Sequence, residues 1–146
     1  MNYKAITTEM LKTLRAGGAP TYAMQDGFVL ITSDGIALYK VPVDNIEINL
    51  DRCSYNPVFA DYLKEDDQQP AEPTGNKKTL GKCTVVELSN DSCTVLINEQ
   101  YLKPFEKPIF AIGPTERNFV LVYEPKQDEP VGIIAPVKPI GRAGEI

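Results

Sequence analysis

The side chains that most often carry chemistry in proteins are scarce in this sequence. Its 146 residues contain no histidine, so the commonest general base and metal ligand is missing. The three cysteines, Cys53, Cys83 and Cys93, lack the close pairing of a zinc or redox motif, and their odd number favours free thiols in a reducing compartment. We therefore expect a non-enzymatic protein with no cofactor and no bound metal.

Carboxylates are the remaining candidates for acid–base or metal chemistry. Glu65, Asp66 and Asp67 are consecutive in a polar stretch and lack the alternating ligand spacing of a calcium loop, which favours a solvating role. A small enzyme with a carboxylate-based site stays as an alternative. Such an enzyme needs a deep pocket that holds at least two acidic side chains with displaced pKa values.

The overall composition is that of one ordinary globular domain. Hydrophobic residues make up 42% of the chain and charged residues 24%, well away from the composition of disordered chains. The net charge of −5 repels phosphate backbones unless lysine and arginine gather on one face. The first residues lack the layout of a secretory signal and no apolar run is long enough to span a bilayer, so we expect a cytoplasmic protein without a membrane partner.

In the first half, periodicity and turn residues predict a helix followed by a group of strands. A short strand is predicted over residues 3–6, and a helix capped by Thr7 or Thr8 is predicted to run to Arg15, shortly before a glycine stop. Asp-Gly steps supply the tight turns of a three-stranded meander. The other elements predicted for this half are strands over 21–24, 28–32, 36–41 and 45–50, and a short helix from Asn56 to about Glu65.

The second half is predicted to repeat this order. Residues 65–78 are polar and rich in proline and glycine, which predicts an exposed connector. Asn98 can cap a brief helix that ends by Lys103, because Pro104 disfavours its continuation. Strands are predicted over 83–88, 93–97, 109–112, 119–123 and 131–135, followed by a loose tail over 141–146. The repeated order predicts one α+β domain over residues 1–140, with halves of about 1–64 and 79–140.

Three short segments resemble a domain of the bacterial DNA sliding clamp, the ring-shaped processivity factor of replicative polymerases. Residues 97–103 (INEQYLK) are similar to the asparagine-x-x-tyrosine-leucine helix start of that family. Residues 133–138 (IIAPVK) are similar to its carboxy-terminal apolar-methionine-proline-methionine-arginine end, although Ala135 replaces a methionine. Residues 6–12 resemble the strand-to-helix step that opens a clamp domain. A clamp subunit has three such domains, and this chain has room for one.

The resemblance implies a DNA-clamp-like fold of two pseudo-symmetric halves, each with a short helix packed on antiparallel strands. It also implies an accessory protein of DNA replication that tracks double-stranded DNA or recruits short linear peptide motifs of replication proteins. Carried over by position, the DNA-binding residues are Lys12, Arg15, Lys103 and Lys107. The partner-binding residues are Ile133, Ile134, Ala135, Pro136, Val137 and Lys138, with Pro136 at an extended edge.

A purely structural role is the alternative for both sets of residues. The four basic residues also fit a solvated helix face, and the apolar segment also fits a buried strand. The main alternative function is a protein-interaction or structural domain that uses the clamp fold without binding DNA, and it predicts that the four basic residues do not converge on one surface. A single clamp domain could encircle DNA only as a homo-oligomer, and its small size suggests a phage or mobile element as the source.

Overall fold

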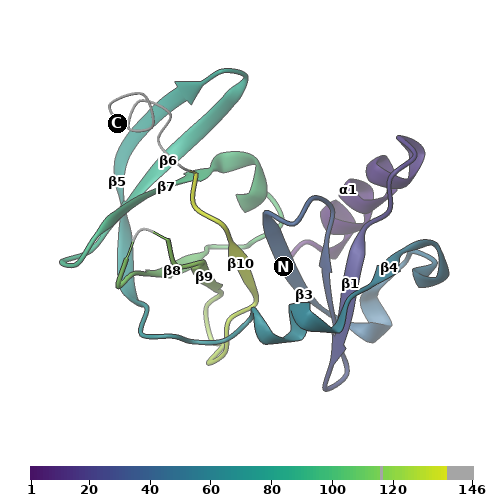
Figure 1. Ribbon diagram of the computed structural model, residues 1–146. Coiled ribbons are helices and arrows are strands. Elements are labelled where there is room, and N and C mark those ends of the chain that lie inside the picture. Colours follow the sequence, from purple (N-terminus) through teal and green to yellow (C-terminus); the bar gives the residue numbers. More distant parts are fainter. Residues whose placement is uncertain (116, 138–146) are drawn as a thin grey trace.

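The computed structural model describes residues 1–115 and 117–137, and within these ranges it is a mixed α+β fold with one α-helix and ten strands (Figure 1). Short 3-10 helices, labelled η, connect several of the strands. The elements in chain order are α1 (Tyr3–Arg15), β1 (Thr21–Gln25), β2 (Phe28–Thr32), β3 (Ala37–Pro42), η1 (Val43–Asn45), η2 (Leu50–Arg52), β4 (Ser54–Tyr55), η3 (Pro57–Asp61), β5 (Gln69–Leu80), β6 (Cys83–Ser89), β7 (Thr94–Asn98), η4 (Glu99–Leu102), β8 (Ile109–Ile112), β9 (Val120–Tyr123) and β10 (Gly132–Ile134).

The ten strands form one connected sheet in the order β4-β1-β2-β3-β10-β9-β8-β5-β6-β7. Strand β10 lies between β3 and β9 and is antiparallel to both, with Ile133 opposite Leu38 on one side and Leu121 on the other. The last described strand therefore joins the amino-terminal meander to the carboxy-terminal strands. The edges of the sheet are β4 and β7.

Apolar residues cover both faces of the central strands, as the two-residue period of a strand requires. On one face, Val29, Ile31 and other buried residues contact α1, which contributes Ile6 and Met10. On the other face, six buried residues pack with the half-buried Phe59, Ala60, Phe119 and Tyr123; the six are Leu30, Leu38, Leu63, Ala111, Leu121 and Ile133. Strands that are buried on both faces read as continuous apolar runs, which explains the strongly hydrophobic sequence of β2 and β9.

The strands of the carboxy-terminal half curl around part of the core. Strand β5 pairs with β8 only over Gln69–Ala71 and then continues as the partner of β6. The segment after β10 reaches the far edge of this group, where the Val137 amide donates to the Leu96 carbonyl of β7 at 2.7 Å. Strands β5 to β10 therefore wrap around buried residues such as Ile97 and Phe110 (Figure 1).

The predicted meander and the strands predicted over 83–88, 93–97, 109–112, 119–123 and 131–135 are confirmed to within two residues at each end. The predicted strand over 3–6 is wrong, because α1 begins at Tyr3. The Asn2 side-chain oxygen accepts from the Ala5 amide at 3.0 Å and caps the helix five to six residues earlier than expected.

Three further predictions fail in the connecting segments. The expected strand over 45–50 is absent from the structure, and this region holds the 3-10 helices η1 and η2 instead. The helices expected from Asn56 and from Asn98 are each a short 3-10 helix, η3 and η4, although both asparagines do cap them. The expected connector over 65–78 is largely strand β5, whose polar residues pair with β6.

The predicted clamp-like pseudo-symmetry is not confirmed. Helix α1 of the first half has 13 residues, whereas its expected counterpart in the second half is the four-residue η4. The long hairpin of β5 and β6 also has no matching element among the described strands of the first half.

Candidate functional site

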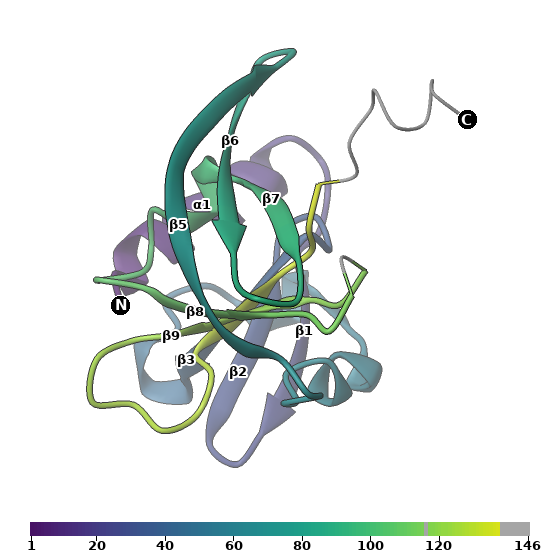
Figure 2. The ribbon, with the colours of Figure 1, turned by 90° about the vertical axis from the view of Figure 1, so that its left-hand side faces the viewer.

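A hairpin arm projects from the body of the protein. Strands β5 and β6 rise beyond their neighbours and meet in a tight turn at Gly81 and Lys82 (Figure 2). The last residues of the hairpin that also pair with β7 are at the level of Lys78, Val85 and Asn98. From Thr79 to Thr84 the hairpin pairs with no third strand among the described residues. We call residues 77–84 the arm; all of them are exposed except the half-buried Leu80.

The arm is basic in an acidic protein. It carries three lysines, Lys77, Lys78 and Lys82, and no aspartate or glutamate. Because the whole chain has a net charge of −5, the chain outside the arm carries −8, which is −5 less the +3 of the arm. The sequence interpretation missed this site because it assigned residues 65–78 to an exposed connector. The signal that could have revealed it is the Gly81-Lys82 step, a two-residue turn between short strand-like segments.

The Glu87 carboxylate accepts hydrogen bonds across the base of the arm, where the pairing of β5 with β6 is irregular. The pairing of β5 with β6 shifts register between Pro73 and Lys77, and Gly75 has a φ of +89°, which favours glycine. The hydroxyl of Thr74 and the side-chain amide of Asn76 both donate to Glu87 Oε1, at 2.9 and 3.1 Å. These hydrogen bonds, Asn76 first, lower the pKa of Glu87 and keep its carboxylate ionised.

One lysine of the arm forms an ion pair with the body. Lys77 Nζ lies 2.8 Å from Glu99 Oε2, and both side chains are substantially exposed. Glu99 is the first residue of η4, directly after β7, so the ion pair connects β5 with the short helix that follows the β6–β7 hairpin. Among the described ion pairs none involves Lys78 or Lys82.

The four basic residues predicted to bind DNA lie near opposite ends of α1. Lys12 and Arg15 are in its last turn. Lys103 and Lys107 lie near its first residue, because the Asn2 amide donates to the Pro104 carbonyl at 2.7 Å. With a rise of about 1.5 Å per residue, these ends of the helix are roughly 15–20 Å apart. The structure thus brings the residues together in pairs and not as one cluster, and their role in DNA binding stays a prediction.

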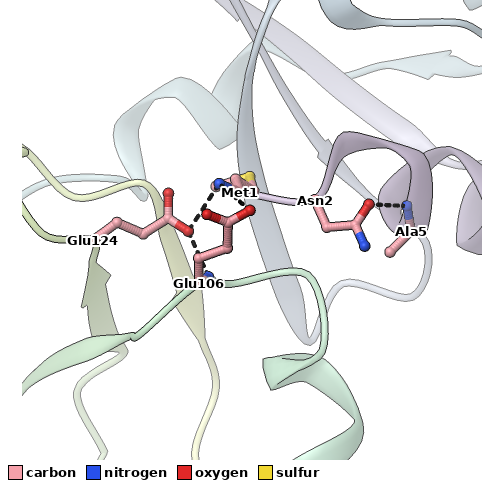
Figure 3. A network of polar contacts seen from close by, with 5 residues as sticks. All are labelled: Met1, Asn2, Ala5, Glu106 and Glu124. Atoms are coloured by element: carbon pink, nitrogen blue, oxygen red, sulfur yellow. Dashed lines mark hydrogen bonds and ion pairs between the residues drawn. The ribbon is translucent and has the colours of Figure 1, made fainter.

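A polar network explains why the loop of Lys103 and Lys107 lies against the start of α1 (Figure 3). The amino-terminal ammonium of Met1 lies 3.2 Å from Glu124 Oε2 and 3.6 Å from Glu106 Oε1. Glu124 Oε2 also accepts from the Glu106 backbone amide at 2.7 Å. Because Glu124 is only 9% exposed, this network ties together the start of α1, the loop before β8 and the end of β9.

The predicted partner-binding segment lies mostly inside the fold. Ile133 and Ile134 are 3% and 0% exposed, and β10 is paired on both sides, so these two side chains are core residues, and the partner-binding role of the segment stays a prediction. The physical reason is that this apolar strand fills the gap between β3 and β9 and buries both of its faces. Ala135, Pro136 and Val137 are half-buried, and Lys138 lies outside the described residues.

The described chain also contains a groove of about 480 Å³ next to β3, lined by Gln25, Asp26, Phe28, Lys40, Leu63, Lys64, Glu65, Glu129 and Pro130. Two of its charged side chains, Lys40 and Glu129, pair with each other. Lys40 Nζ lies 3.1 Å from Glu129 Oε2 and 4.4 Å from the centre of the Phe28 ring, and Glu65 Oε1 accepts from the Tyr123 hydroxyl at 3.0 Å. Three of the lining residues are acidic, Asp26, Glu65 and Glu129, and the alternative of a small enzyme with a carboxylate-based site stays a prediction.

In the part of the chain that the structure describes, no group of three or more His, Cys, Asp or Glu side chains is placed to hold a metal ion. The described helix is also neither long nor apolar enough to cross a membrane. Comparison of the chain with protein-family models, curated proteins and solved structures finds no match.

Proposed function

We propose that this chain is a non-enzymatic, cytoplasmic accessory protein that associates with double-stranded DNA and contacts it through the arm. The observation that carries the proposal is the charge of +3 over residues 77–84, with no acidic residue among them, in a chain of net charge −5. Lysine contacts to phosphate oxygens supply most of the sequence-independent affinity for DNA.

The shape of the arm supports this proposal. A two-stranded ribbon has a width that the major groove of B-DNA admits, and β-ribbons are a known docking element. The arm turns at Gly81, three residues beyond Lys78, the last level at which the hairpin also pairs with β7. At the rise of an extended strand, the tip therefore lies about 10 Å beyond that level. This distance slightly exceeds the Debye length of about 8 Å at physiological ionic strength, so the tip is partly screened from the acidic body.

The clamp-like assembly is also part of our proposal. Three lysines hold DNA weakly, whereas a closed ring of several copies holds it by topology. The resemblance of residues 97–103 and 133–138 to sliding clamps supports a ring, and the edge strands of the described sheet, β4 and β7, are the places at which copies would join. Light scattering coupled to size-exclusion chromatography measures the number of copies.

The decisive experiment measures binding of a short labelled duplex by fluorescence anisotropy over a range of salt concentrations, starting at low salt. For three lysine–phosphate contacts, the slope of log K against log salt is expected near about −2.7. The variant Lys78→Gln/Lys82→Gln is expected to keep a slope near about −0.9 and to bind more weakly. The variant Lys12→Gln/Arg15→Gln removes the same charge from α1 and serves as the matched control.

The results separate the two candidate DNA surfaces. If only the arm variant loses affinity, the arm is the contact. If only the helix variant loses affinity, the surface implied by the clamp resemblance is the contact and the arm is not. Absence of binding by the unmodified protein at low salt contradicts DNA association altogether.

A second function, association with further copies of the chain, is favoured by the same charge separation. A basic arm complements the acidic body of a neighbouring copy, and such contact gives a homo-oligomer without DNA. This function predicts assembly in the absence of DNA that dissociates at high salt and is lost in Lys78→Gln/Lys82→Gln. A salt-independent monomer contradicts it.

A further inference from the structure

The three lysines of the arm are not equivalent. Lys77 is paired with Glu99 at 2.8 Å, whereas Lys78 and Lys82 form none of the described ion pairs. The register places Lys77 opposite Val86 and Lys78 opposite Val85, so the two lysines point to opposite faces of the hairpin. Lys77 therefore shares its face with Val86, which packs against the main core, and this side of the arm is held by η4.

The base of the arm is a place where the hairpin can change direction. The register shift between Pro73 and Lys77 interrupts the ladder of β5 and β6 on the body side of Lys77. At this bulge Glu87 accepts hydrogen bonds from the neutral donors Thr74 and Asn76, and Lys78 acts on it electrostatically without forming one of the described ion pairs. The contact with Glu99 is different, since it joins opposite charges on two exposed side chains, and an anion can replace one of them.

We propose that Glu99 is an internal competitor for the anion that the arm binds. In the free protein its carboxylate occupies Lys77 as a phosphate would, and DNA releases Lys77 from Glu99 when a phosphate takes its place. This inference rests on the proposed association with DNA and adds a regulatory element to it. The ion pair thus limits the affinity and holds the arm in one orientation while no DNA is bound.

The size of the effect follows from the exposure of the pair. Exposed ion pairs stabilise by little, so removing the competitor is expected to tighten DNA binding by about two- to fivefold. A general gain from lost negative charge is a separate effect that falls off with distance and salt. The experiment must therefore distinguish a specific release of Lys77 from a change in net charge.

The test compares duplex binding of the unmodified chain, Glu99→Gln and Glu47→Gln at one low salt concentration. Glu47 is an exposed carboxylate between η1 and η2, outside the arm, so its replacement makes the same change in net charge. Glu99→Gln is expected to tighten binding and Glu47→Gln to change it less. In the background of Lys77→Gln, the further change Glu99→Gln is expected to tighten binding no more than Glu47→Gln does, because the lysine that it releases is gone.

Two results overturn the inference while the proposed function stands. One is DNA binding by the unmodified chain that Glu99→Gln does not tighten. The other is an equal gain from Glu99→Gln with and without Lys77, which shows a net-charge effect only. If the unmodified chain does not bind the duplex at low salt, the proposed function fails and the inference fails with it.

Discussion

Replacing Gly132 by alanine tests the strand that joins the two halves of the sheet. A Cβ at this position would lie 2.6 Å from Phe105 Cζ and 2.8 Å from the Leu38 carbonyl oxygen, closer than real Cβ contacts. The Phe105 ring can shift, but the Leu38 carbonyl belongs to β3, which pairs with β10. Overpacking and the loss of one or two ladder hydrogen bonds give an expected destabilisation of about 2–4 kcal/mol.

The assay is reversible unfolding by heat and by urea, followed by circular dichroism. At about 4 °C per kcal/mol for a domain of this size, Gly132→Ala is expected to lower Tm by roughly 8–16 °C. Gly18→Ala is the matched control, because its nearest neighbour is the flexible Thr13 side chain at 3.2 Å. In the background of Phe105→Leu the cost of Gly132→Ala is expected to fall only in part, since the clash with Leu38 remains.

An unchanged stability of Gly132→Ala would refute this reasoning. It would mean that the backbone of β10 does not approach Leu38 closely enough to exclude a methyl group. The register between β3 and β10 would then be wrong, and with it the continuity of the ten-stranded sheet.

Three further predictions concern polar groups. Glu124→Gln removes the buried partner of the Met1 ammonium and is expected to destabilise by about 1–3 kcal/mol in urea unfolding, whereas Glu106→Gln, at an exposed and more distant carboxylate, is expected to cost less than about 0.5 kcal/mol. Asn90→Asp is expected to lower Tm by several degrees, roughly 1–2 kcal/mol, because the Asn90 amide nitrogen donates to two backbone carbonyls of β5 and β8 that a carboxylate would repel. Burial and the hydrogen bond to Asp34 raise the pKa of Tyr101 to about 12. The stabilisation of the fold by the protonated Tyr101 hydroxyl is therefore present below the ordinary pKa near 10 and is lost as pH rises through about 12. The stability difference between the unmodified chain and Tyr101→Phe is expected to shrink over that range, and a constant difference would contradict the shift.

The fold can be predicted where local signals and tertiary pairing agree. Asp26-Gly27 and Asp34-Gly35 supply the left-handed turns of the meander, and Gly27 and Gly35 do have positive φ values in the structure. The strands that bury both faces are predictable because apolar runs of that length favour strands. Asn56 and Asn98 are recognisable as caps, but a cap does not tell how far a helix continues, and both helices are short 3-10 segments.

The candidate site could not be predicted because pairing overrides propensity there. Residues 69–80 contain two prolines, a glycine and several polar residues, which are typical of a loop. Pro73 and Gly75 lie at the register shift, where a bulge tolerates both, and the polar side chains are exposed on a hairpin that has solvent around it. Only the partner strand β6, with Val85, Val86 and Leu88, carries an apolar signal, and the prediction of that strand is confirmed.

If the chain binds DNA as we propose, its separation of charge limits how it does so. A chain that carries −8 outside the arm repels the phosphate backbone, so contact through the arm is favoured and would leave the body roughly a Debye length away. With Lys77 engaged by Glu99, two lysines are left to begin the contact, which makes a single copy a weak and salt-sensitive ligand. Useful residence on DNA therefore requires several linked arms, because each further arm binds at the high effective concentration set by the first. The number of copies in an assembly therefore sets the salt slope of DNA binding by that assembly. An assembly of n copies that bind through their arms must show a slope about n times that of one arm, and a slope that does not grow with assembly would place the arms away from the DNA.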